Sequence, residues 1–249
     1  MLEILTSDAI PLRHGFFTRK GGASSGIFAG LNCGQGSTDQ SDIVAINRAR
    51  VAEALDLPPN ALVSLNQTHS ARVVTLTQPT AERLPADGMV TQVPGIGLAI
   101  LTADCQPVLF ADPKARVIGA AHAGWRGARD GVLEATLDAM EALGARRADI
   151  HAVIGPTISQ SAYEVGPEFF EAFVADEPAN GRFFVPGQGD RLRFDLPSFG
   201  LARLRAAGVG HAEWTRACTY SDPERFYSFR RTTHAGEADY GRLVSVIRL

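Results

Sequence analysis

The stretch "RVIGAAHAGWRGARDGVLEATLDAMEALG", residues 116–144, contains the clearest change of pattern in the chain. Its first part is a short apolar run, which predicts a strand over 116–122 that ends in His122. Over 128–143 apolar side chains recur near every third or fourth position, which predicts a helix followed by a glycine. The stretch therefore joins a strand to a helix, with an imidazole, an indole and the guanidinium of Arg126 at the join.

Short apolar and β-branched runs on both sides of this stretch predict further strands. We expect strands over 61–65, 72–77, 88–93, 96–102, 107–111, 150–155 and 241–249, and helices over 39–57, 167–174 and 197–207. The glycine-rich residues 19–37 are expected to form a long loop. Because the strands do not alternate regularly with helices, the pattern favours one α+β domain over residues 1–249, with helices packed over a large mixed sheet.

The composition of the chain excludes several classes of protein. It is 45% hydrophobic and 20% charged, with a formal net charge of −3 and no basic block, which argues against binding to nucleic acid or membranes. No secretory signal and no membrane-spanning run are recognisable. Three cysteines are an odd number, so a disulfide framework is not expected. We therefore expect a cytoplasmic enzyme that forms a monomer or a small homo-oligomer.

Three metal-ligating residues stand at the edges of apolar runs. His69 lies in "LNQTHSARV", Cys105 in "LTADCQPVLF" and His122 in "AAHAGWRG". Their spacing is unlike that of a zinc finger, and a single histidine or cysteine at a strand end is most commonly a packed core residue. A functional role therefore requires the three side chains to converge in the fold.

If they converge, the residues leave more than one chemistry open. Two imidazoles and a thiolate can hold zinc and leave the fourth tetrahedral position for water or substrate. Alternatively, Cys105 is the nucleophile of a thiol enzyme, with His122 or His69 as its base. A copper centre also uses two histidines and a cysteine, but it needs a further weak axial ligand.

Three arginines are candidates for binding an anion. Arg19, Arg126 and Arg230 lie beside glycines or aromatic residues, and Arg126 is close to the start of a predicted helix, where an anion is favoured. The alternative for Arg126 and Arg230 is a surface charge stacked on Trp125 or Phe229.

The acid–base candidates are Asp87, Asp104 and Glu164. Asp87 precedes a glycine and is therefore expected to be a turn residue. Asp104 adjoins Cys105, and successive residues of a strand point to opposite faces, so we expect it to organise the backbone around the site. Glu164 has no feature beyond its position after a tyrosine.

Seven segments taken together resemble a known family. They are "HGFFTRKGG", "NQTHSARV", "ADGMVT", "TADCQPVLFAD", "AAHAGWRG", "IGPTISQSAYEVG" and "CTYSDPERFYSFRR", in this order over nearly the whole chain. This set is similar to the YfiH-like family, variously described as laccase-domain protein, polyphenol oxidase, peptidoglycan editing factor and purine nucleoside phosphorylase. One departure is that Ser221 and Phe229 stand where the family pattern leads us to expect a cysteine and a tyrosine.

The resemblance implies an α/β/β/α layered fold with mixed sheets, related to a group of cysteine hydrolases. It also implies that His69, Cys105 and His122 bind zinc, with copper as an alternative occupant. Members of the family are described as phosphorylases of adenosine, inosine and S-methyl-5′-thioadenosine, with adenosine deaminase activity. A role in removing wrong amino acids from peptidoglycan precursors is attributed to bacterial members.

Physical chemistry separates these activities. Six histidines in the whole chain cannot fill both a blue-copper site and a histidine-rich trinuclear copper cluster, so we discount laccase chemistry. Phosphorolysis needs an anion pocket, for which Arg19, Arg126 and Arg230 are the candidates. The H-x-E signature of zinc-dependent deaminases is absent from this sequence, because His122 is followed by alanine and glycine. A deaminase would therefore need its acid–base carboxylate from another segment.

We therefore expect a zinc-dependent purine nucleoside phosphorylase and adenosine deaminase, with Cys105, His122 and Arg126 as its catalytic residues and a nucleoside and phosphate as its substrates. The alternative is a hydrolase that edits amino acids in a peptidoglycan precursor, through zinc-bound water or a Cys105 nucleophile. A third class is a metal-binding module without catalytic activity.

Overall fold

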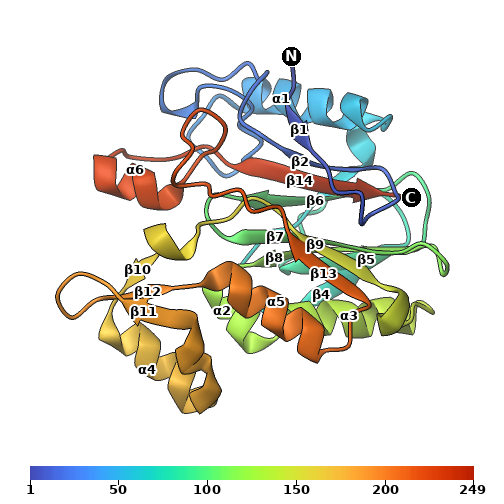
Figure 1. Ribbon diagram of the computed structural model, residues 1–249. Coiled ribbons are helices and arrows are strands. Elements are labelled where there is room, and N and C mark those ends of the chain that lie inside the picture. Colours follow the sequence, from blue (N-terminus) through green and yellow to red (C-terminus); the bar gives the residue numbers. More distant parts are fainter.

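Two β-sheets lie face to face in the computed structural model, which describes residues 1–249 (Figure 1). The first sheet has five strands in the order β1 (Ile4–Leu5), β2 (His14–Phe17), β14 (Leu243–Arg248), β6 (Gly97–Thr102) and β3 (Leu62–Ser64). The second has six strands in the order β13 (His211–Trp214), β9 (His151–Ile154), β7 (Gln106–Asp112), β8 (Val117–Ala123), β5 (Gly88–Thr91) and β4 (Val73–Thr75).

Both sheets are mixed. In the first sheet β14 runs antiparallel to β2 and β6, whereas β3 is parallel to β6. In the second sheet the four central strands, β9, β7, β8 and β5, are antiparallel to one another. The edge strands β13 and β4 are parallel to their neighbours β9 and β5. Since β14 pairs with β2, segments from the two ends of the chain share one sheet. This pairing supports the single domain expected over residues 1–249, which we retain as a proposal.

Helices cover the outer face of each sheet. The five-stranded sheet is covered by α1 (Ser41–Ala54). The six-stranded sheet is covered by α2 (Trp125–Asp130), α3 (Val132–Ala142) and α5 (Leu196–Ala206) (Figure 1). A small sheet of β10 (Glu164–Val165), β12 (Leu192–Phe194) and β11 (Phe184–Pro186) lies at one side with α4 (Pro167–Asp176), and α6 (Phe229–Ala235) is the last helix. The order of layers is therefore helix, sheet, sheet, helix.

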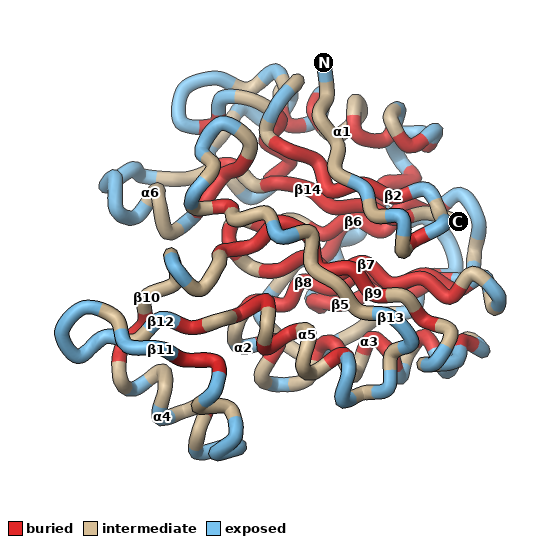
Figure 2. Tube along the Cα trace, viewed as in Figure 1, coloured by how far each residue is buried: buried red, intermediate tan, exposed pale blue.

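Strand periodicity explains how the two sheets share a core. In β6, Leu98 and Ile100 pack between the sheets, while Ala99 packs on the side of α1. In β8, Ile118 and Ala120 pack between the sheets in the same way. Figure 2 shows this interior as continuous buried strands. Thr102 and His122 follow the same alternation, so both side chains belong to the face between the sheets, at the ends of their strands.

The α+β fold class with mixed sheets is confirmed. The single large sheet favoured by the residue pattern is wrong, because consecutive strands β6 and β7 belong to different sheets. The helix expected over 128–143 starts at Trp125 and is interrupted at Gly131, whose φ of 96° is left-handed. Strands β1, β2 and β10 to β13 and helix α6 were not expected, because most are too short to show a period.

The break at Gly131 gives a stability prediction. Replacing Gly131 with Ala should lower the free energy of unfolding by about 1–2 kcal/mol, since a side chain disfavours the left-handed region and the nearest atom to an added Cβ is 3.7 Å away. Gly181→Ala is the matched control: its φ is not left-handed and its site has room, so stability should be unchanged or slightly higher. Chemical denaturation measures both; equal stabilities of the two variants would contradict the prediction.

Candidate metal centre

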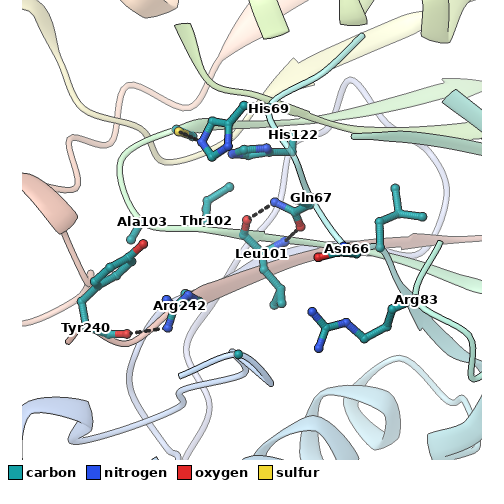
Figure 3. A pocket seen from close by; sticks show the side chains of 13 residues that line it. Asn66, Gln67, His69, Arg83, Leu101, Thr102, Ala103, His122, Tyr240 and Arg242 are labelled. Atoms are coloured by element: carbon teal, nitrogen blue, oxygen red, sulfur yellow. Dashed lines mark hydrogen bonds between the residues drawn. The ribbon is translucent and has the colours of Figure 1, made fainter. Parts of the chain in front are cut away.

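Three separate segments bring His69, Cys105 and His122 together (Figure 3). His69 lies in the loop between β3 and β4, Cys105 immediately precedes β7, and His122 is in β8. One ligand atom of each residue lies within 4.8 Å of those of the other two. The Cys105 Sγ is 3.9 Å from His69 Nε2, and the two imidazole rings are 4.7 Å apart between centroids. The convergence required by the sequence interpretation is present in the fold.

Asp87, at the start of β5, fixes the loop that carries His69. Its carboxylate is fully buried and accepts hydrogen bonds from the backbone N–H groups of Thr68 (3.1 Å), His69 (3.0 Å) and Ser70 (2.7 Å). The Ser70 hydroxyl donates a further bond of 2.8 Å. These bonds hold His69 in a left-handed conformation with φ of 61°, which a non-glycine residue adopts only when its surroundings impose it.

The same carboxylate orients His122. The Nδ1 of His122 donates to Asp87 Oδ1 at 2.8 Å, and this bond sets the tautomer and leaves Nε2 for a ligand. A carboxylate behind a metal-binding histidine is a recurrent arrangement, since it aligns the ring and makes it a stronger base. The sequence favoured a turn role for Asp87, and no signal in the sequence revealed that it would reach both His69 and His122.

A second buried carboxylate, Asp104, holds the backbone next to Cys105. Asp104 has a φ of 84° and accepts from Thr219 Oγ1 (2.6 Å), Ser228 Oγ (2.9 Å) and Arg230 N (2.6 Å). These donors come from the C-terminal quarter of the chain. The expectation that Asp104 organises the backbone around the site agrees with these contacts.

The three charged groups of the cluster shift one another's pKa values. Burial raises the pKa of the Cys105 thiol, but the imidazoles of His122 and His69 outweigh burial and lower it to about 7. Burial raises the pKa of Asp87 as well, yet His122 and the Ser70 donors bring it well below its ordinary value. Burial lowers the pKa of His122, but Cys105 and Asp87 outweigh burial and raise it to about 9. Without a metal, the proton on His122 balances the thiolate and the carboxylate, and a bound metal would take the place of that proton.

The three residues fit a tetrahedral ion. Zinc bonds to sulfur at about 2.3 Å and to nitrogen at about 2.0 Å, which places ligand atoms roughly 3.3–3.6 Å apart. The distance between Cys105 Sγ and His69 Nε2 is 3.9 Å and all three ligand atoms lie within 4.8 Å of one another, so the side chains would move together by up to about an ångström to hold the ion. Since His69 is exposed and Cys105 half-buried, a fourth position would face the openings beside the triad.

Two hollows of about 250 Å³ each adjoin the triad. The first, which we call the polar hollow, is lined next to the triad by Asn66, Gln67, Arg83, Thr102, Tyr240 and Arg242 (Figure 3). The second, the aromatic hollow, is lined by Asp104, Trp125, Ile158, Tyr163, Leu196, Phe229 and Arg230. The hollows share His69, Ala103 and Cys105, so the triad lies where they meet.

The arginines proposed from the sequence lie in different places. Arg19 lies outside both hollows and donates to the carbonyls of Ala29 (2.8 Å) and Pro223 (3.1 Å). Arg126 is exposed and lies 5.1 Å from the centre of the Trp125 ring. Arg230 does line the aromatic hollow, where it donates to the Glu164 carbonyl at 2.6 Å.

Sequence reasoning missed Arg83 and Arg242, which line the polar hollow. Arg83 lies in a segment without any recognisable period, and Arg242 lies at the start of the strand predicted over 241–249. Nothing local to either residue indicates that it reaches the triad. The carboxylate of Glu164 lines neither hollow.

Fold and site together define a mixed α/β protein with a candidate His–Cys–His metal site. The profile of the family described as "Multi-copper polyphenol oxidoreductase laccase" matches residues 13–249, and the chain belongs to this family. The YfiH-like resemblance is thereby confirmed.

Named relatives and solved structures are similar over nearly the full length. A Deinococcus radiodurans protein named purine nucleoside phosphorylase is 42% identical, with 100% of this chain and 93% of the relative aligned. A Pseudomonas aeruginosa protein with the same name is 40% identical over 88% of each chain. The crystal structure of Neisseria meningitidis protein NMB0706 has a TM-score of 0.89 and 34% identity, covering 99% of this chain and 98% of that one. The Geobacillus stearothermophilus YlmD structure has a TM-score of 0.82 and 30% identity, covering 94% and 90%.

The histidines of this chain are too few and too dispersed for the copper sites of a laccase, the activity in the family description. His69, Cys105 and His122 form the one group of three or more histidine, cysteine and acidic side chains that could hold a metal. The other four histidines are spread over β2, β9, β13 and α6. A histidine-rich trinuclear copper cluster in addition to a metal at the triad would therefore lack ligands. No helix combines the length and the apolar character that crossing a membrane requires.

The role of Asp87 can be tested by metal titration. Asp87→Asn should weaken the binding of Zn²⁺ by about 10- to 100-fold, because His122 loses the carboxylate that orients it. Competition against a chelating dye gives the affinity, and circular dichroism reports whether the variant is folded. Asp8→Asn, an exposed aspartate outside the site, is the matched control. Should Asp87→Asn fail to fold, Asp87→Glu takes its place; unchanged affinity in a folded variant would refute the assigned role.

Proposed function

We propose that this protein is a zinc-dependent purine nucleoside phosphorylase. Its substrates are phosphate and adenosine, inosine or S-methyl-5′-thioadenosine. The products are the free base and ribose 1-phosphate, or 5-methylthioribose 1-phosphate from the last of these nucleosides. The observation that carries the proposal is the His69–Cys105–His122 triad, which could hold a metal ion, at the meeting point of two hollows. The names of relatives 35–42% identical to this chain support it. The proposal takes zinc as the occupant and copper as the alternative, since both accept imidazole and thiolate ligands.

In phosphorolysis an oxygen of phosphate forms a bond to C1′ of the ribose, and the bond from C1′ to the base nitrogen breaks. The base leaves with the electron pair and takes up a proton. Bound zinc would supply a Lewis acid beside the reacting centre. The catalytic role proposed for Cys105 and His122 is to hold that centre, with His69, at the meeting point of the hollows.

Arg126 and Arg230 are the sequence candidates for binding phosphate. Arg126 adjoins Trp125 and lines neither hollow, and Arg230 lines the aromatic hollow, so both are proposed only for a substrate group on the aromatic side. We no longer propose Arg19 as a phosphate contact, because its guanidinium donates to backbone carbonyls outside both hollows.

The proposal includes deamination of adenosine as a second reaction. In this reaction the oxygen of water forms a bond to C6 of the base, and the bond from C6 to the amino group breaks, which releases ammonia. A metal held by His69, Cys105 and His122 would lower the pKa of that water. Among the residues that line the hollows, Asp104 is the one carboxylate. It accepts three hydrogen bonds, which suits a positioning role.

A second candidate function follows from the same residues. Cys105, His122 and Asp87 have the order of nucleophile, base and orienting carboxylate found in thiol hydrolases. The lowered pKa of Cys105 favours the thiolate. An amide in a peptidoglycan precursor is the substrate class we propose for this alternative.

We propose the cytoplasm as the place of action. The three cysteines are free, as thiols are in a reducing compartment. The partners implied by the proposal are small molecules, a nucleoside and inorganic phosphate.

Chromatography of the purified protein with inosine separates the two functions. We expect hypoxanthine and ribose 1-phosphate only when phosphate is present, loss of activity with a chelator, and recovery with Zn²⁺. Cys105→Ser should reduce the rate at least 100-fold, whereas Cys218→Ser, a half-buried cysteine outside both hollows, should stay near the wild-type rate. Survival of inosine under every condition would reject the phosphorylase. Amide hydrolysis that resists chelation but is blocked by alkylation would establish the thiol hydrolase.

A further inference from the structure

We propose that the substrates bind across the triad, with inorganic phosphate in the polar hollow against Arg83 and Arg242, and the purine base in the aromatic hollow. This inference rests on the proposed phosphorylase function and assigns a side to each substrate.

The polar hollow is lined by two arginines and by no acidic residue. Arg83 and Arg242 are its charged side chains apart from the triad, and no acidic residue lines it. The guanidinium of Arg83 makes no hydrogen bond or ion pair anywhere in the protein, so all its donors are free. Nη1 of Arg242 donates to the Tyr240 carbonyl at 3.0 Å and lies 3.6 Å from the Asp239 carboxylate. The other two guanidinium nitrogens of Arg242 have no partner. Guanidinium groups with free donors bind phosphate well, because the planar fork matches two of its oxygens.

A buried hydroxyl in the same hollow also lacks a partner. Thr102 is 3% exposed, and its Oγ1 makes no hydrogen bond. Thr102 ends β6 on the face between the sheets, next to the triad. Buried polar groups are nearly always paired, so an unpaired hydroxyl in a lined hollow indicates a polar ligand. The side-chain amide of Asn66 makes no hydrogen bond either and offers a further contact to phosphate or to a ribose hydroxyl.

The aromatic hollow suits a flat, uncharged base. Trp125, Tyr163 and Phe229 line it, and Phe229 is 51% exposed, which is unusual for a large apolar side chain. Asp104 is on this side, where its carboxylate accepts hydrogen bonds from Thr219, Ser228 and the backbone of Arg230. Arg230 is the single cation of this hollow and donates to the Glu164 carbonyl at 2.6 Å. The polar hollow has two arginines and no acidic residue, so it is the side assigned to the anion.

The geometry of displacement agrees with this assignment. In a substitution at C1′ the attacking phosphate oxygen and the departing base nitrogen lie on opposite sides of the carbon, in line. Because the two hollows share His69, Ala103 and Cys105, a ribose placed at the triad has one hollow on each side. Phe229 and Tyr240, one from each hollow, pack against each other with ring centres 5.0 Å apart, which forms part of the wall between them.

Paired variants test the assignment through the two Michaelis constants. Arg83→Gln should raise the KM for phosphate at least tenfold and leave the KM for inosine within twofold. Phe229→Ala should do the reverse. Arg191→Gln is the charge-matched control and should change neither constant, because Arg191 is exposed, makes no side-chain hydrogen bond or ion pair and lines neither hollow. Both test residues are exposed, so loss of folding is not expected.

Equilibrium dialysis with radioactive inorganic phosphate and with hypoxanthine gives a second readout that needs no turnover. Weaker phosphate binding in Arg83→Gln, with hypoxanthine binding retained, supports the assignment. A phosphate KM that rises in Arg230→Gln and not in Arg83→Gln would overturn it. If the wild-type protein produces no hypoxanthine, the proposed function fails, and dialysis still decides: weaker phosphate binding in Arg83→Gln upholds the anion site, and equal binding disproves it.

Discussion

The candidate site depends on one buried carboxylate. Asp87 accepts three backbone N–H groups and a hydroxyl from the loop over 68–70, and on its other side it accepts the Nδ1 of His122. A buried charge is costly unless it is fully paired, and the bonds that pair Asp87 also position His69 and His122, the two imidazoles of the candidate metal site. Asp104 acts in the same way on the backbone beside Cys105. The triad is thus preorganised by groups that do not themselves face a ligand.

The layered fold explains why the hollows lie where they do. The strand alternation that packs Ile118 and Ala120 between the sheets places His122 on the same face, and the same rule applies to Thr102 in the opposite sheet. Where the apolar packing ends, these polar side chains replace it and the space between the sheets opens into the polar hollow. The aromatic hollow is lined by Trp125, where β8 leads into α2, and by Phe229 from the C-terminal segment. A reaction between a charged and an uncharged substrate is well served by two such different surfaces at one metal centre.

The sequence predicted the fold class and the three residues of the candidate metal triad, because short motifs identify residues whose chemistry is distinctive. It did not reach the pairing of strands, since β6 and β7 are neighbours in sequence and lie in different sheets. It assigned Asp87 to a turn from its glycine neighbour and could not see contacts to residues 17 and 35 positions away. Arg19 was selected from its glycine-rich surroundings, yet backbone carbonyls occupy its guanidinium. Arg83 was not selected, because what distinguishes it is the absence of a partner, which only the folded chain reveals.

The central claim is that His69, Cys105 and His122 bind one metal ion and leave a position open. X-ray absorption of the zinc-loaded protein tests it directly. The account predicts one sulfur at about 2.3 Å, two imidazole nitrogens at about 2.0 Å and one further light atom, with the sulfur lost in Cys105→Ser. A first shell without sulfur, or one that is unchanged by the Cys105→Ser substitution, would contradict it.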